Sequence, residues 1–196
     1  MIRKAKDTDK EALMQMWNLC FPEEDDYFLN FYFDNVYSNK ETLVYEENSQ
    51  PVASLQMIPY RLKIADSIVW GGYISGAMTH PDHRKKGYMA QLLQASFNEM
   101  IKKGYDYTFL IPEEKGLIKM YEKYGFRLCK TSKEPPVNKV LKSIKQWKII
   151  KQNYFDDYEV WLKDEIYFPK ERKGMIKKLN PDAEEITALY MGMMLD

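Results

Sequence analysis

The chain has 196 residues, a length that favours one domain or one domain with a small addition. Hydrophobic residues make up 45% and charged residues 30%, which is typical of a globular protein with a substantial core. Lys and Arg together number 29, as do Asp and Glu, so the net charge is zero. This balance argues against a general nucleic-acid binder, which usually carries a basic excess.

The cysteine content and the hydropathy indicate the cellular compartment. Cys20 and Cys129 are too few for a disulfide framework, and both lie in apolar stretches typical of buried thiols. The first ten residues contain no apolar stretch like that of a signal peptide, and no window approaches the ~18 apolar residues of a membrane span. We therefore expect a cytoplasmic protein without a membrane partner.

Hydrophobic periodicity predicts the elements of the first half of the chain. It favours a strand at 1–6, helices over 7–21 and 22–37, and strands at 41–48, 51–65 and 67–80. Gly71, Gly72 and Gly76 fall inside the last of these strands, where glycines often mark a bulge or a close approach of backbones.

The pattern continues with a helix from about Tyr88 to Lys103. Its apolar positions follow helical spacing and are Met89, Leu92, Leu93, Phe97, Met100 and Ile101. We then expect a buried strand at 105–112, a short helix over 113–125 and a strand at 126–130.

The segment "TSKEPP" interrupts this order, and we place a domain boundary there. Beyond it we expect a small α+β extension, with strands at 137–142, 158–164, 165–168 and 173–179 and a helix over 143–155. A terminal helix over 180–196 is predicted from Asn180 as cap and Pro181 at the first helical position.

One turn, "HPDHRKKGYM", points to chemistry. Arg84, Lys85 and Lys86 precede Gly87 between a strand and a helix. The first N–H groups of a helix have no internal partner, and the helix dipole adds positive potential there, so phosphates bind such ends readily. A solvated basic turn is the alternative interpretation.

The order of elements resembles the GNAT (GCN5-related N-acetyltransferase) superfamily over residues 1 to about 132. The resemblance rests on "GAMTHPDHRKKGYMAQLL", which is similar to the acyl-CoA loop R/Q-x-x-G-x-G/A, and on "LIKMYEKYGF", which is similar to "fYeklGF". The last loop position is Met89 rather than Gly or Ala, and this variant resembles the Eis family of acetyltransferases. The resemblance implies a GNAT fold, a mixed α/β (α+β) sheet flanked by helices, over residues 1–132. Residues 133–196 would form an extension packed on that domain, similar to a reduced sterol-carrier-like module.

The resemblance also implies roles for individual residues. The backbone of Ala77, Met78 and Thr79 would pair with the pantetheine arm of acetyl-CoA, and the amides from Lys85 to Ala90 would hold the pyrophosphate. The expected cofactor-binding residues are therefore Ala77, Met78, Thr79, Arg84, Lys85, Lys86, Gly87, Tyr88, Met89 and Ala90. Arg84 and Lys86 are the side chains expected to touch phosphate or ribose.

Two catalytic residues are implied. Tyr121 matches the family tyrosine that protonates the departing CoA thiolate, and a phenol with a pKa near 10 is protonated at neutral pH. In the Eis family a C-terminal carboxylate acts as base, and here the apolar tail "LYMGMMLD" would hold the carboxylate of Asp196. A tail helix that leaves Asp196 in solvent is the alternative.

These implications favour an acetyl-CoA-dependent N-acetyltransferase that acts on a primary amine of a small molecule, peptide or protein. A non-catalytic acyl-CoA sensor is the second hypothesis, and a nucleic-acid-binding protein, opposed by the zero net charge, is the third. We expect no metal, because His80 and His83 have no further ligands nearby in the sequence. The oligomeric state, including a homo-oligomer, stays open.

Overall fold

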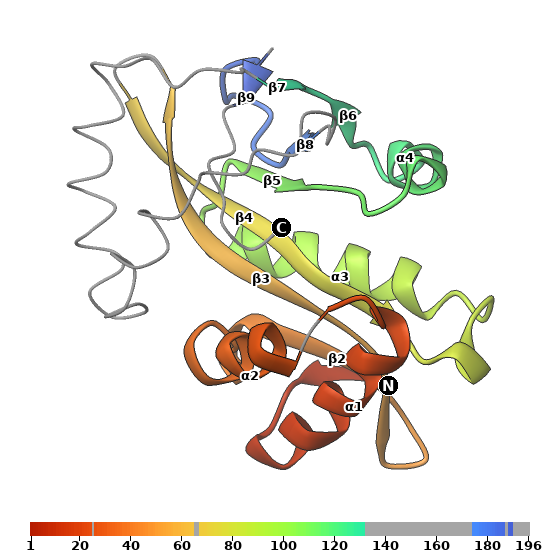
Figure 1. The fold of residues 1–196 in the computed structure, drawn as a ribbon. Coiled ribbons are helices and arrows are strands. Elements are labelled where there is room, and N and C mark those ends of the chain that lie inside the picture. Colours follow the sequence, from red (N-terminus) through yellow and green to blue (C-terminus); the bar gives the residue numbers. More distant parts are fainter. Residues whose placement is uncertain (25, 65–66, 132–173, 187, 190–196) are drawn as a thin grey trace.

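The fold is a mixed β-sheet with helices on both faces, seen in a computed structural model (Figure 1). The structure describes residues 1–24, 26–64, 67–131, 174–186 and 188–189. The helices are α1 (Lys10–Cys20), α2 (Asp26–Asn35), α3 (Tyr88–Lys102) and α4 (Lys115–Glu122), with short 3-10 turns η1 (Asp7–Asp9), η2 (Asn39–Glu41) and η3 (Pro81–His83). The strands are β1 (Ile2–Lys4), β2 (Thr42–Glu47), β3 (Gln50–Ile64), β4 (Ser67–Thr79), β5 (Tyr107–Leu110), β6 (Arg127–Leu128), β7 (Lys130–Thr131), β8 (Met175–Lys178) and β9 (Ala188–Leu189).

The main sheet has the strand order β1-β2-β3-β4-β5-β8-β6. Strands β1 to β4 pair antiparallel, β4 and β5 pair parallel, and β8 runs antiparallel to both of its neighbours. A separate parallel pair joins β7 to β9. The predicted α/β class, with a mixed central sheet flanked by helices, is confirmed.

Two hydrophobic clusters cover the two faces of the sheet. On one face, α1 and α2 pack through Leu13, Trp17 and Tyr32 against Val44 and Met78 of the sheet. The other face is covered by α3 and α4, whose buried residues include Leu92, Leu93, Phe97, Met100 and Tyr121. Figure 1 shows α1 and α2 side by side at one end of the sheet and α3 running along β4. The loop over 80–87 joins β4 to α3.

Strand β8 changes the expected organisation of the chain. The predicted boundary near residue 132 assigns this segment to the extension, yet Met175–Lys178 lies inside the main sheet between β5 and β6. A strand at 173–179 was expected, but its position in the main sheet was not predicted. For residues 133–173 the predicted extension stays a prediction, because they lie outside the described residues.

The predicted terminal helix over 180–196 is wrong in the part that the structure describes. Asn180 to Ala183 form a turn, and Ala188–Leu189 is a strand. Asn180 donates from Nδ2 to Asp106 Oδ1 at 2.7 Å, and its backbone amide donates to Asp106 O at 3.1 Å. These tertiary bonds hold the turn against the β5 side of the sheet, so the local capping signal does not lead into a helix.

The second helix is also shorter than predicted. It begins at Asp26 rather than at Pro22 and ends at Asn35. The predicted helix that follows the basic loop is confirmed, since α3 spans Tyr88–Lys102.

Candidate functional site

The site begins where β4 and β5 separate. These strands pair only through Gly71–Tyr73 and Tyr107–Phe109, although β4 continues to Thr79. In the described part of the chain, Ile74–Thr79 therefore has a strand partner on the β3 side alone. Its other backbone edge carries N–H and C=O groups that are available to an extended ligand.

A β-bulge lies within Ile74–Thr79, the stretch that has no strand partner on the β5 side. Gln56 pairs with Ser75 and Ser54 with Met78, so that Gly76 and Ala77 both lie opposite Leu55. Gly76 has φ +53°, a left-handed conformation that glycine adopts without steric penalty. The bulge confirms that a glycine in this strand marks an irregularity.

The loop between β4 and α3 offers a row of free amides. Lys85 has φ +63° and Gly87 φ +79°, and α3 begins at the next residue. The amide of Gln91 donates to Gly87 O at 3.3 Å. Within the described ranges, the amides from Lys85 to Ala90 have no protein acceptor. A Cβ on Gly87 would meet nothing within 4 Å, so the backbone there is open to a bound group. This geometry fits an anion at the helix N-terminus.

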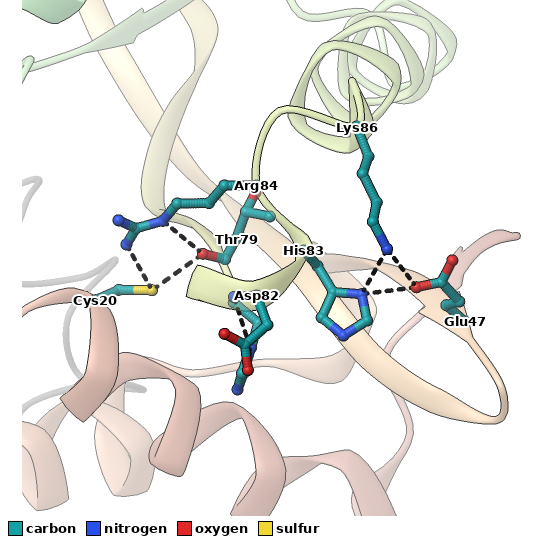
Figure 2. A network of polar contacts seen from close by, with 8 residues as sticks. Cys20, Glu47, Thr79, Asp82, His83, Arg84 and Lys86 are labelled. Atoms are coloured by element: carbon teal, nitrogen blue, oxygen red, sulfur yellow. Dashed lines mark hydrogen bonds and ion pairs between the residues drawn. The ribbon is translucent and has the colours of Figure 1, made fainter.

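Arg84 turns back toward the end of β4 rather than outward from the loop. Its Nε donates to Thr79 O at 3.3 Å, and its Nη2 lies 3.8 Å from Cys20 Sγ. The Cys20 thiol donates to the same carbonyl at 3.4 Å, as Figure 2 shows. Arg84 and Cys20 thus fix the last residue of β4 against the end of α1.

Lys86 is bound to Glu47, at the end of β2 (Figure 2). Glu47 Oε2 lies 3.5 Å from Lys86 Nζ and 2.6 Å from His83 Nδ1, and Oε1 accepts from the Tyr88 hydroxyl at 2.6 Å. The hydrogen bond from Tyr88, followed by those from His83 and Lys86, lowers the pKa of Glu47. The same bond to Glu47 raises the pKa of Tyr88 to about 12.

Aromatic stacking strengthens this attachment of the loop to the β2–β3 hairpin. The rings of Tyr45 and Tyr88 stack with centroids 4.0 Å apart and planes 13° apart. Sequence reasoning missed Glu47 and Tyr45, since no motif singles them out and their role depends on strand pairing. With Arg84 and Lys86 engaged, Lys85 is the exposed loop cation for which the described residues supply no partner.

The remaining predicted loop residues contribute backbone more than side chain. Met78 is buried beside α1 and α2, and Ala77 packs on the opposite cluster. Met89 is half-buried against the α3 side of the core, and Ala90 is half-buried. Thr79 is half-buried, and its carbonyl is the acceptor described above.

Tyr121 lies in α4 with 6% of its surface exposed. Its ring packs edge-on against Phe126 with centroids 5.7 Å apart. Burial raises the pKa of Tyr121 to about 12, so the phenol stays protonated throughout the neutral range. No described residue forms a hydrogen bond to its hydroxyl. The other predicted catalytic residue, Asp196, lies outside the described residues.

Two further features of the described residues bear on function. None of them gathers three His, Cys, Asp or Glu side chains into a possible metal site. No helix among them has the length and apolar character needed to cross a membrane.

Comparisons with known proteins agree with this architecture. A family model described as "Acetyltransferase (GNAT) domain" matches residues 1–129. No curated protein sequence matches the chain. Rv2747 from Mycobacterium tuberculosis, solved in complex with CoA, is 13% identical with a TM-score of 0.59, and the match covers 91% of this chain and 98% of that one.

Larger proteins contain the same fold as one part. A GCN5-related N-acetyltransferase from Anabaena variabilis is 16% identical with a TM-score of 0.56, over 66% of this chain and 32% of that chain. Eis1 from Mycobacterium abscessus is 12% identical with a TM-score of 0.56, over 64% and 31%. The chain thus spans about a third of the length of these two proteins, and identities this low show the fold alone. The Eis-like subfamily stays a prediction.

The family model covers residues 1–129 of the 196. Together with the glycine loop that opens α3, the match identifies the chain as a member of the acetyltransferase (GNAT) domain family.

Proposed function

We propose that the protein is an acetyl-CoA-dependent N-acetyltransferase that transfers the acetyl group to a primary amine. The observation that carries this proposal is the continuity of two binding elements. The open edge of Ala77–Thr79 is followed, after the η3 turn, by the free amides from Lys85 to Ala90. An extended ligand with a diphosphate at one end fits this sequence of groups.

The chain's own groups would divide the binding of acetyl-CoA as follows. The backbone of Ala77 and Met78 would pair with the pantetheine amides, and the loop amides would hold the pyrophosphate. Among the loop cations we assign the phosphate contact to Lys85, because Arg84 and Lys86 already bind Thr79 and Glu47. This assignment differs from the expectation for Arg84 and Lys86.

The chemical step would be direct transfer. The amine nitrogen forms a bond to the acetyl carbonyl carbon, the carbon–sulfur bond breaks, and the sulfur accepts a proton from the Tyr121 hydroxyl. The amine loses one proton to water and the tyrosine regains one from water, so the products are an N-acetyl amine and the free CoA thiol. A backbone N–H near Met78 would polarise the carbonyl oxygen.

Apolar surroundings support this role for Tyr121. The burial that raises its pKa to about 12 also keeps it a hydrogen-bond donor through the neutral and mildly alkaline range. The same low-polarity environment destabilises a thiolate and favours its protonation. Burial therefore favours the protonated form of both the Tyr121 phenol and the departing sulfur.

Binding is tested by thermal unfolding with and without acetyl-CoA. Ligand that binds only the folded protein stabilises it by about 2.7 kcal/mol at 100 times Kd. We expect this rise in Tm for the wild type and its loss in Gly87→Asp, which places a negative charge in the loop. Gly104→Asp is the matched control, since Gly104 also has positive φ and open space but lies beyond the other end of α3.

Catalysis is tested by release of the CoA thiol from acetyl-CoA with a panel of amines. The panel holds aminoglycosides, polyamines, amino acids, peptide N-termini and protein lysines. Turnover that Tyr121→Phe lowers supports the proposal. A Tm shift without turnover on any amine would instead identify an acyl-CoA-binding module. No Tm shift in the wild type would overturn the acyl-CoA site.

A further inference from the structure

We infer that Lys177 of β8 is a positioning residue for Tyr121, holding the end of α4 so that the phenol points at the reacting sulfur. The inference rests on the proposed role of Tyr121. It concerns a residue more than 50 positions away in the chain, brought beside α4 by the placement of β8 between β5 and β6.

Lys177 makes one short bond to the turn that follows α4. Its Nζ donates to Tyr124 O at 2.6 Å and lies 4.5 Å from the centroid of the Phe97 ring in α3. Burial lowers the pKa of Lys177, consistent with an ammonium that has left solvent to reach this carbonyl. The ammonium therefore bridges the carbonyl end of α4 and the face of an α3 aromatic ring.

The turn that Lys177 binds is built on Tyr121 itself. Tyr121 O accepts from the amides of Tyr124 at 2.9 Å and Phe126 at 3.3 Å. The Phe126 ring in turn packs edge-on against the Tyr121 ring and lies 5.8 Å from Phe97. The backbone and the ring of Tyr121 are thus both fixed by the turn from Tyr124 to Phe126.

Lys177 also occupies the space next to the sharpest point of this turn. Gly125 has φ +84°, and a Cβ placed there would come 2.9 Å from Lys177 Nζ. A helix of only eight residues has little internal rigidity, and its last carbonyls carry partial negative charge. Removing the ammonium leaves Tyr124 O without its donor in a half-buried setting, which allows the turn and α4 to shift.

Lys178 provides a matched control on the same strand. Its Nζ donates to Ala183 O at 3.1 Å and lies 3.5 Å from Glu185 Oε1. Lys177→Met and Lys178→Met each remove one ammonium and one bond to a backbone carbonyl from β8. Only the first change reaches α4.

The experiment measures thiol release from acetyl-CoA with the amine that the wild type acetylates fastest in the panel above. We expect Lys177→Met to lower kcat by about tenfold, because small displacements of a catalytic group reduce rates strongly. The KM for acetyl-CoA should stay within about twofold, since the loop amides are untouched. Lys178→Met should keep kcat, and Lys177→Arg should restore most of it.

A double variant separates this inference from the proposed function. If Lys177 acts through Tyr121, Lys177→Met lowers kcat little further in a Tyr121→Phe background. Equal loss in both backgrounds, or equal kcat for Lys177→Met and Lys178→Met, would overturn the inference. Unchanged kcat in Tyr121→Phe would overturn the proposed role of Tyr121, whereas absence of turnover in the wild type would overturn the proposed function. If Lys177→Met does not fold, Lys177→Gln and Lys178→Gln take the places of the two Met variants.

Discussion

The indole of Trp17 in α1 lies directly against Gly76 in β4, so that a Cβ on Gly76 would come 2.5 Å from Trp17 Cζ3. Gly76 also has φ +53° and forms the bulge that leads to Ala77. The first helix therefore packs directly against the bulge that precedes the proposed pantetheine edge.

Gly76→Ala should lower the free energy of unfolding by about 3 kcal/mol, because the new methyl group combines backbone strain with overpacking against Trp17. Denaturant unfolding measures the change. Gly116→Ala in α4 is the control, since a Cβ there meets nothing within 4 Å. It should be neutral or stabilising by up to about 1 kcal/mol. Equal stability of the two variants would show that the Trp17 ring moves to accept the methyl group at little cost in free energy.

The pH dependence of kcat should reflect the buried phenol. Because burial raises the pKa of Tyr121 to about 12, loss of its proton should not lower kcat between pH 7 and roughly pH 10. Steady-state rates of thiol release with acetyl-CoA saturating measure the profile. A descending limb below pH 10 that persists in Tyr121→Phe belongs to another group. One that disappears in Tyr121→Phe would contradict the raised pKa.

The loop cations should contribute unequally to CoA binding. Lys85→Ala should weaken CoA binding by about fivefold, the loss of one exposed charge contact to phosphate. Lys86→Ala should have a smaller effect, because Lys86 Nζ is held by Glu47 at 3.5 Å. Calorimetric titration with CoA measures both constants. Equal effects would mean that Lys86 leaves Glu47 when CoA binds.

Low pH should lower the free energy of unfolding by weakening the contact of Asp9 in η1 with Arg3 in β1. Its carboxylate accepts from Arg3 Nη1 at 2.6 Å, from Arg3 Nη2 at 3.0 Å and from the Lys6 amide at 2.7 Å. The hydrogen bonds from Arg3, and then the one from Lys6, lower the pKa of Asp9 despite burial. The carboxylate therefore stabilises the fold above its unfolded pKa near 4, and this stability is lost as the pH falls through the lower, folded value.

Asp9→Asn should accordingly lower the free energy of unfolding at pH 7 by about 3 kcal/mol, since it leaves a partly buried guanidinium without its main partner. The difference from wild type should shrink toward pH 3. Asp34→Asn is the control, because Asp34 is exposed and its bond to Lys10 lies at the surface. It should change stability by less than about 0.5 kcal/mol. A pH-independent difference would argue against the titration of Asp9.

Local patterns were sufficient to predict the elements that carry the loop. The apolar spacing of Leu92, Phe97 and Met100 predicted α3, and all three residues are buried. Ile101 was expected on the same face, but half of its surface is exposed because it lies just beyond the buried arc of the helix. The run of basic residues before Gly87 predicts an anion site without any knowledge of the sheet, and this site stays a prediction.

Contacts between distant segments were beyond the reach of these patterns. Glu47 reaches His83, Lys86 and Tyr88 only because the β2–β3 hairpin folds beside the loop. Asn180 carries a valid capping signal, yet Asp106 captures it into a turn. In each case the deciding partner is 35 or more residues away, and a periodic pattern reports only on neighbours within a few turns.

The position of β8 has a consequence for how the chain is made. During synthesis β5 and β6 emerge from the ribosome well before Met175–Lys178, so the antiparallel partner that joins them is missing until late. The exposed edge of β5 is open to wrong pairing during that interval, and closing the sheet requires a long-range contact that slows folding. We therefore expect a chain cut after residue 131 to aggregate, and the full chain to complete its main sheet only when residue 178 has been released.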